Sequence, residues 1–231
     1  MPHASELSAL FLDAGNTVVF LDTDVVASVA EDAGVRVSAA TLSAVEGAAK
    51  RRYEEAMVAG GKHEGGFRLY LTTLLTEAGV SPDRARDLLT PLRAAHDELN
   101  LWRRVPDDLP AALERARGLG LRLGIISNSE GKLPELFARV GLGDAFEIVI
   151  DSAHEGIAKP DPEIFLRAAQ RMGISPHRGL HAGDIPAIDV EGALSAGMHA
   201  ALIDPLDFYP AHDRSPRHAS VSALVASLTH G

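Results

Sequence analysis

The feature that most constrains the fold is an alternation of short apolar runs with amphipathic helical patterns after about residue 103. Four runs of strand length are visible there, at 121–128, 146–151, 179–184 and 198–204. The segments between them place apolar residues three and four positions apart, which is the spacing of one helix face. Strands that alternate with helices form βα units, and such units build a parallel sheet. The sequence therefore predicts a parallel α/β sheet in this part of the chain.

One further strand is predicted at 7–12, before a long segment without strand signals. From about 22 to 99 the chain is rich in alanine and shows helical periods interrupted by glycine. We expect about four helices in this segment. The predicted fold class is α/β: a doubly wound parallel, Rossmann-like sheet core formed by 1–19 and 103–231, with an inserted helical cap at 20–102.

Composition and charge exclude several classes of function. The formal net charge of −10 argues against a nucleic-acid backbone as the main partner. No run of about 18 apolar residues is present, so we expect no membrane partner. The absence of cysteine removes disulfides, thiolate metal sites and cysteine nucleophiles. The start of the chain, MPHASELSALFLDAG, lacks the basic residues of a secretory signal, so we expect a cytoplasmic protein.

Polar residues of catalytic type gather where the predicted strands end, or in a loop that can reach the same edge of the sheet. They are Asp13 with Thr17, Ser127 with Asn128, Lys159, and Asp184 with Asp189. One such residue alone is typical of a helix cap, a turn or a surface loop. In an open parallel sheet, however, ligands bind outside the carboxyl ends of the strands. Four signals in these positions therefore indicate one shared site.

The residue types favour phosphoryl transfer. Three converging carboxylates, Asp13, Asp184 and Asp189, would repel one another without a cation between them. Mg²⁺ prefers oxygen ligands and bridges carboxylates to substrate phosphates, so Mg²⁺ is the expected cofactor. Asp13 can act as a covalent nucleophile, while Ser127 and Lys159 can supply a donor and a positive charge for the phosphoryl oxygens. We expect a small phosphorylated molecule as the substrate.

Four segments resemble the four motifs of the haloacid dehalogenase (HAD) superfamily. They are FLDAGNTVV, GIISNSE, IAKPDPEIF and HAGDIPAIDVEGALSAGM, so the resemblance covers essentially the whole chain. It implies an Asp13 nucleophile, with Thr17 in the first motif and Ser127, beside Asn128, in the second. Ser127 and Lys159 would hold the phosphoryl group. The helical segment after the first motif looks like the helical (C1) cap of this superfamily.

The same resemblance implies a set of metal ligands. They would be Asp13, Asp184, Asp189 through a water molecule, and the main-chain carbonyl of Gly15. The position of Gly15 is also a departure, because the usual phosphatase pattern of the superfamily has a second Asp there. That Asp protonates the leaving oxygen and then activates water, and glycine can do neither. General acid–base catalysis is typically worth about 10²–10⁴ in rate, so we expect a slow enzyme rather than a dead one.

Two other functions remain open at this point. Gly15 is compatible with a catalytically weak or silent member that binds a phosphorylated ligand. A metal-independent 2-haloacid dehalogenase is the third reading, although dehalogenases of the superfamily carry an aromatic residue where this chain has Gly15. The sequence does not fix the oligomeric state, and we expect a monomer or a homodimer.

Several other polar residues have simpler interpretations. The stretch GGKHEGG at 60–66 is interpreted as a turn between cap helices, which makes Lys62, His63 and Glu64 candidates for substrate selection. The stretch KRRYEE at 50–55 is interpreted as an exposed helix face. His181 lies inside a predicted strand, where a buried core histidine is favoured over a ligand.

Overall fold

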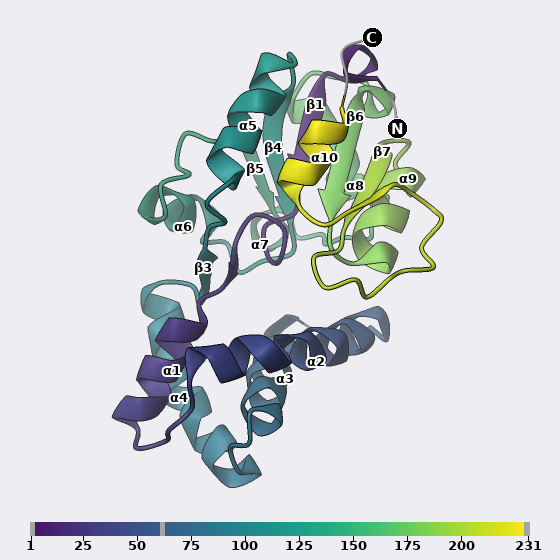
Figure 1. Cartoon of the computed structure of the whole chain (residues 1–231). Helices are drawn as coiled ribbons and strands as arrows, with labels where there is room; N and C mark the ends of the chain where they lie inside the picture. The colour runs from purple at the N-terminus through teal and green to yellow at the C-terminus, as the bar shows by residue number, and fades with distance from the viewer. Residues whose placement is uncertain (1–2, 61–62, 229–231) are drawn as a thin grey trace. The chain divides into compact units, whose positions relative to one another are not determined.

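The computed structural model of the chain describes residues 3–60 and 63–228 (Figure 1). The chain divides into two compact units. One consists of Met1–Phe20 and Arg104–Gly231, and we call it the sheet unit. The other, Leu21–Arg103, is the helical unit.

The sheet unit contains a six-stranded sheet in the order β5-β4-β1-β6-β7-β8, and every pair in it is parallel. The strands are β1 (Ala9–Leu12), β4 (Arg122–Ser127), β5 (Ile148–Asp151), β6 (Gly179–Gly183), β7 (His199–Ile203) and β8 (Arg217–His218). This architecture confirms the predicted α/β class with a doubly wound sheet. The order reverses at β1, because β4 and β5 extend to one side of it and β6, β7 and β8 to the other. Such a switch point is where open α/β sheets bind ligands.

Helices cover both faces of this sheet. The helical elements of the sheet unit are η1 (Ala4–Glu6), α5 (Leu109–Gly118), α6 (Leu133–Arg139), α7 (Ser152–Glu155), α8 (Pro162–Arg171), η2 (Pro176–Arg178), η3 (Pro186–Val190), α9 (Glu191–Ser195) and α10 (Val221–Ser227). One face packs on α8 and α9, with Phe11 and Ile150 of the sheet against Phe165 of α8. On the other face α5 and α10 pack together (Figure 1). Because both faces are covered, the central strands are mostly apolar, and all four residues of β1 are buried.

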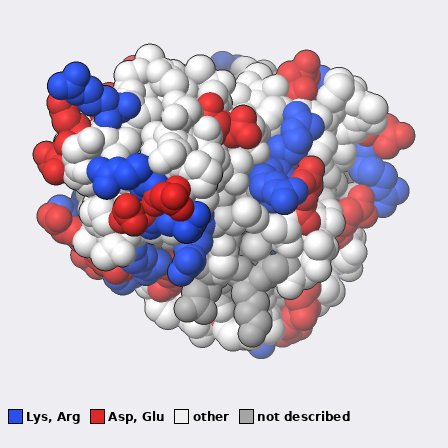
Figure 2. All heavy atoms as spheres, turned by 90° about the horizontal axis from the view of Figure 1, so that it is seen from below, with Lys and Arg blue, Asp and Glu red and all other residues white. Residues whose placement is uncertain are grey.

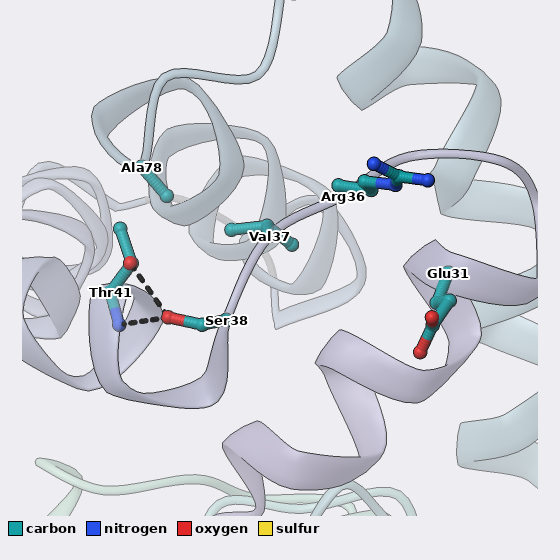
Figure 3. Close-up of a pocket in the computed structure, with 6 residues that line it drawn as sticks. All are labelled: Glu31, Arg36, Val37, Ser38, Thr41 and Ala78. Carbon is teal, nitrogen blue, oxygen red and sulfur yellow. Dashed lines mark hydrogen bonds between the residues drawn. The ribbon is translucent and has the colours of Figure 1, made fainter.

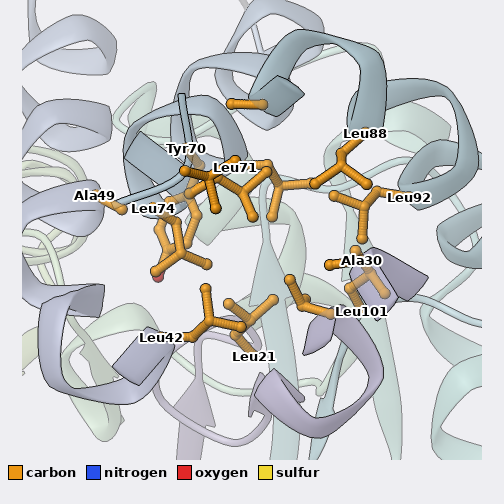
Figure 4. Packing of buried hydrophobic residues seen from close by; sticks show 14 of the residues in the cluster. Leu21, Ala30, Leu42, Ala49, Tyr70, Leu71, Leu74, Leu88, Leu92 and Leu101 are labelled. Carbon is orange, nitrogen blue, oxygen red and sulfur yellow. The ribbon is translucent and has the colours of Figure 1, made fainter. Parts of the chain in front are cut away.

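The helical unit is built from α1 (Thr23–Asp32), α2 (Ala39–Val58), α3 (His63–Glu77) and α4 (Pro82–Glu98). Its core joins Val26 and Ala30 of α1, and leucines of α2, α3 and α4, to Tyr70, and Figure 4 shows Leu42, Leu74 and Leu88 pointing into it. Trp102 packs edge-on against Tyr70, with ring centroids 5.0 Å apart. The chain passes between the two units through a pair of short strands, β2 (Phe20–Leu21) and β3 (Trp102–Arg104).

Two expectations for the helical unit are wrong. The stretch 50–55 is not an exposed face throughout, because Lys50 is 3% and Glu54 6% exposed, and the two form a buried ion pair along α2. The predicted turn at 60–66 is also too long, because α3 already begins at His63. Gly66 belongs to this helix and lies against Tyr53, where a Cβ atom would come within 2.5 Å of the ring. The side of α2 that the protein buries is set by packing within the helical unit, which the local sequence does not show.

None of the helices within 3–60 and 63–228 combines enough length with enough hydrophobicity to span a membrane.

Candidate active site

The sheet unit brings three carboxylates together at the carboxyl end of its central strands. Asp13 follows β1 directly, Asp184 follows β6, and Asp189 lies in η3. Each offers a carboxylate oxygen within 4.8 Å of the others, and all three side chains are buried. The main chain fixes the first of them, because the Asp13 N–H donates to the carbonyl of Ala182 over 2.9 Å and so extends the ladder between β1 and β6.

Lys159 neutralises part of this charge. Its Nζ lies 2.7 Å from Asp13 Oδ1 and 2.6 Å from Asp189 Oδ1, and the side chain is buried. Burial by itself lowers the pKa of Lys159, yet the charges of Asp13 and Asp189 outweigh it and hold that pKa above its ordinary value. Lys159 is therefore a fixed ammonium that bridges two carboxylates.

Asp189 is held on both oxygens by the protein itself. Its Oδ1 accepts from Lys159 and lies 2.9 Å from His181 Nε2, while its Oδ2 accepts from the Ile185 N–H over 3.0 Å. Burial alone raises the pKa of Asp189, but the positive charge of Lys159 and the hydrogen bond from His181 hold it below its ordinary range. The carboxylate also packs on Gly183, where a Cβ atom would lie 2.2 Å from Asp189 Cγ. Glycine before Asp184 is thus a spatial requirement, which sequence reasoning missed.

Asn128 forms its hydrogen bonds with the backbone of Lys159. Its amide nitrogen donates to the Lys159 carbonyl over 2.9 Å, and its Oδ1 accepts from the Lys159 N–H over 2.8 Å. Both polar ends of the amide therefore fix the backbone of Lys159, and the next helix begins two residues later at its Asp161 cap. Ser127, the residue before Asn128, is the buried last residue of β4. The structure thus uses Asn128 to position Lys159.

The loop after Asp13 has room at the residue that departs from the usual pattern. A Cβ atom on Gly15 would meet no heavy atom within 4 Å. Asn16 adopts a left-handed backbone with φ of 55°, as an asparagine in a turn can. Thr17 is buried, and its Oγ1 finds no hydrogen-bond partner within the described part of the chain. A buried hydroxyl without a partner is rare in a structural role.

Asp151 is a buried carboxylate that the sequence analysis did not single out. It ends β5, and its Oδ2 accepts from the hydroxyl of Ser129 and from the N–H of Gly131. Its Oδ1 accepts from the N–H of Ala153 over 3.0 Å. Asp151 therefore orders the loop that follows Ser127. Its position at the end of a predicted strand was the available signal.

The charges of the described site fit a divalent cation. Three buried carboxylates lie together, and two of them, Asp13 and Asp189, share the Lys159 ammonium. Oxygen donors from carboxylates are the ligands of hard cations such as Mg²⁺. Both oxygens of Asp189 are engaged within the protein, by Lys159, His181 and the Ile185 N–H.

Lys62 lies outside the described residues, as do the side chains of His63 and Glu64, so their predicted role in selecting substrate stays a prediction. A pocket of about 420 Å³ belongs to the helical unit alone, and Figure 3 shows its Ser38 and Thr41 bonded to each other at the start of α2. Figure 2 shows Lys and Arg side chains interleaved with Asp and Glu on the face it displays.

Comparisons with known proteins agree with the motifs. A family model described as haloacid dehalogenase-like hydrolase matches residues 7–197. A haloacid dehalogenase-like hydrolase domain-containing protein 3 of Mus musculus is 37% identical over 121 residues, which cover 51% of this chain and 46% of that protein. A phosphoserine phosphatase of Thermus thermophilus is 35% identical over 131 residues, which cover 56% of this chain and 51% of that protein. The chain thus matches about half the length of these curated relatives.

A solved structure supports the same fold. The HAD hydrolase YfnB of Bacillus subtilis, solved bound to magnesium, aligns with a TM-score of 0.72 at 19% sequence identity. The alignment covers 96% of this chain and 98% of that chain.

Proposed function

Because the chain belongs to the haloacid dehalogenase-like hydrolase family, we propose that it is a Mg²⁺-dependent hydrolase of a small phosphorylated metabolite. The observation that carries the proposal is the buried group of Asp13, Asp184 and Asp189, with oxygens within 4.8 Å and Lys159 bonded to two of them. The phosphatase activity of the relative from Thermus thermophilus is in line with this chemistry.

The proposed metal ligands are Asp13, Asp184 and the main-chain carbonyl of Gly15, with Asp189 acting through a water molecule. When bound, Mg²⁺ would supply positive charge next to the transferred phosphoryl group. The protein contributes the rest of the charge, because the Lys159 ammonium is held within hydrogen-bond distance of Asp13 Oδ1. Thr17 and Ser127 are the hydroxyl donors proposed for the phosphoryl oxygens.

The proposed reaction has two steps. In the first, a carboxylate oxygen of Asp13 bonds to phosphorus and the bond from phosphorus to the substrate oxygen breaks, which leaves an alkoxide. In the second, water attacks the phosphorus of the aspartyl-phosphate and releases the Asp13 carboxylate; one water proton stays on the inorganic phosphate, and the other passes to solvent and balances the proton that the alkoxide takes up. Lys159 stabilises the negative charge in both steps.

Gly15 determines which substrates this site can serve. It cannot protonate the departing alkoxide, and no carboxylate at this position can take the proton from water. The proposed substrates are therefore phosphate esters whose oxygen leaves readily as an anion, or whose own structure supplies the proton. The helical unit is proposed to act as a cap that closes during the reaction and excludes water, with Lys62, His63 and Glu64 selecting the substrate.

A second function has one observation in its favour. Gly15 removes the proton-transfer residue while Asp13, Asp184 and Lys159 keep their places, which is the pattern of a protein that binds a phosphorylated ligand without turning it over. The metal-independent dehalogenase reading is weaker, because a cluster of three buried carboxylates suits a cation.

The test is hydrolysis of p-nitrophenyl phosphate with Mg²⁺ and with EDTA. We expect release of p-nitrophenol by the wild type in Mg²⁺, none in EDTA, and none by Asp13→Asn. The matched control is Asp107→Asn, an exposed residue of the sheet unit, which should behave as the wild type. Retained activity of Asp13→Asn, or equal activity in EDTA, would refute the proposed mechanism. Metal binding with no turnover of a broad panel would favour the binding protein, and metal-free halide release from a 2-haloacid would favour the dehalogenase.

A further inference from the structure

His181 is a buried polar side chain that the proposed reaction does not yet use. It lies in β6 with 0% of its surface exposed, and its ring packs edge-on against Phe165 with centroids 5.0 Å apart. Its Nε2 lies 2.9 Å from Asp189 Oδ1. Its Nδ1 is also buried and has no hydrogen-bond partner within the described part of the chain.

These contacts decide where the single proton of the ring sits. Asp189 is ionised beside Lys159, and a carboxylate can only accept hydrogen bonds. The short contact therefore requires a proton on Nε2 of His181, and Nδ1 carries the bare lone pair. Burial lowers the pKa of His181, in keeping with a neutral ring. His181 thus gives Asp189 a hydrogen bond without adding a positive charge that would compete with Lys159.

The position of His181 in the sheet does not by itself call for a polar residue. The register places it opposite Phe11 of β1 and Ala200 of β7, and its neighbours Leu180 and Ala182 are buried and apolar. An apolar residue would fill this place on the side of α8 at least as well. The imidazole is therefore explained by Asp189 rather than by packing.

We propose that His181 is a positioning residue, which fixes the Asp189 carboxylate so that Asp189 in turn holds the Lys159 ammonium against Asp13. This inference rests on the proposed function. The geometry supports it, because Asp189 Oδ1 is shared between His181 and Lys159 while Oδ2 is tied to the Ile185 N–H. Without the Nε2 donor, one of these bonds is lost, and the carboxylate can rotate away from Lys159.

The first test is spectroscopic and needs neither metal nor substrate. Nitrogen NMR of the ¹⁵N-labelled full chain distinguishes the two neutral tautomers of His181, and we expect the Nε2–H form. The ammonium signal of Lys159 should be visible in the wild type, because its protons are held by two carboxylates and exchange slowly. We expect His181→Gln, whose amide can still donate, to keep that signal, and His181→Leu to lose or shift it.

The second test is kinetic, with p-nitrophenyl phosphate and Mg²⁺. Loss of a residue that holds the residues around a metal site typically costs about 10–100-fold, so His181→Leu should lower kcat by about that factor. KM should change by less than about twofold, because the loss affects the transition state rather than substrate binding. His181→Gln should recover most of the activity. His199→Gln, at the first residue of neighbouring β7 and away from the carboxyl ends of the strands where the site lies, is the matched control and should behave as the wild type.

The outcomes separate this inference from the proposed function. A wild type that hydrolyses substrate, combined with an unaffected His181→Leu, would overturn the inference alone. An Nδ1–H tautomer, or a His181→Gln as impaired as His181→Leu, would overturn it too. A wild type with no hydrolysis would refute the proposed function, and the Lys159 signal in His181→Leu would then decide the inference without any activity.

Discussion

Replacing Gly15 by aspartate should restore the proton transfer that this site lacks. The structure has room for the new side chain, because a Cβ atom at this position meets no heavy atom within 4 Å. The backbone of Gly15 also lies outside the left-handed region, so an aspartate is not strained there. The variant should therefore fold as the wild type does and differ from it mainly in one carboxyl group.

The size of the effect should depend on the leaving group. General acid–base catalysis is worth about 10²–10⁴ in rate, which corresponds to roughly 2.7–5.4 kcal/mol at 1.36 kcal/mol for each factor of ten. An alkyl phosphate leaves as a strongly basic alkoxide, so Gly15→Asp should raise its kcat/KM by about that factor. The p-nitrophenolate anion is stable without a proton, so kcat/KM for p-nitrophenyl phosphate should change by less than about threefold.

The assay compares kcat/KM of the two substrates in Mg²⁺, since kcat/KM reports the steps up to formation of the aspartyl-phosphate. Gly15→Asn is the matched control, because it has nearly the same shape and no acid. If Gly15→Asp does not improve alkyl phosphate hydrolysis over an active wild type, the assigned role of this position is wrong. An equal gain in Gly15→Asn would show that proton transfer is not the cause.

Three further predictions concern other charged groups. Lys159→Met should lower kcat for p-nitrophenyl phosphate by about 10²–10³, the usual loss for one preorganised charge-stabilising donor, while circular dichroism stays unchanged; a smaller loss would contradict its role. Burial raises the pKa of Asp204, but hydrogen bonds from two main-chain N–H groups and from Arg217 outweigh burial and hold that pKa below its ordinary value. The ionised Asp204 carboxylate therefore stabilises the fold above its unfolded pKa, and this stabilisation is lost as the pH falls. Asp204→Asn should therefore lower Tm at pH 7 by about 4–8 °C, equivalent to about 2 kcal/mol, and by less below pH 4. Calorimetry at the two pH values checks this, and an equal loss of Tm at both pH values would refute the assigned role of Asp204. Lys50→Met should cost about 3–5 kcal/mol in urea unfolding, and the double variant with Glu54→Leu much less, because the single change leaves a buried carboxylate without its ammonium.

The order of strands and helices was readable from the sequence, because strands covered on both faces appear as short apolar runs. The run predicted at 179–184 corresponds to β6, and the run at 198–204 to β7. By contrast, β8 and α10 were not predicted. β8 has only two residues and lies at the edge of the sheet, where pairing with β7 rather than a local apolar pattern makes it a strand.

Candidate site residues could also be predicted where a residue of catalytic type directly follows a predicted strand. Asp13 and Asp184 each follow an apolar run directly, and the parallel sheet brings such ends to one edge. Their roles as nucleophile and metal ligands stay predictions until the experiments above are done. The contacts that position them were not readable. Asn128 bonds to a main chain 31 residues away, and Asp151 reaches back 22 residues to Ser129.

The sequence by itself therefore determined the α/β class, the family and the residue types available at the strand ends, because local hydrophobicity and short motifs encode them. Only the tertiary structure decided which of those polar groups touch. His181 was expected to be a buried core histidine and is buried, yet its bond to Asp189 depends on how η3 turns back over β6. Side-chain contacts between separate elements are set by packing in three dimensions, and a one-dimensional pattern does not contain them.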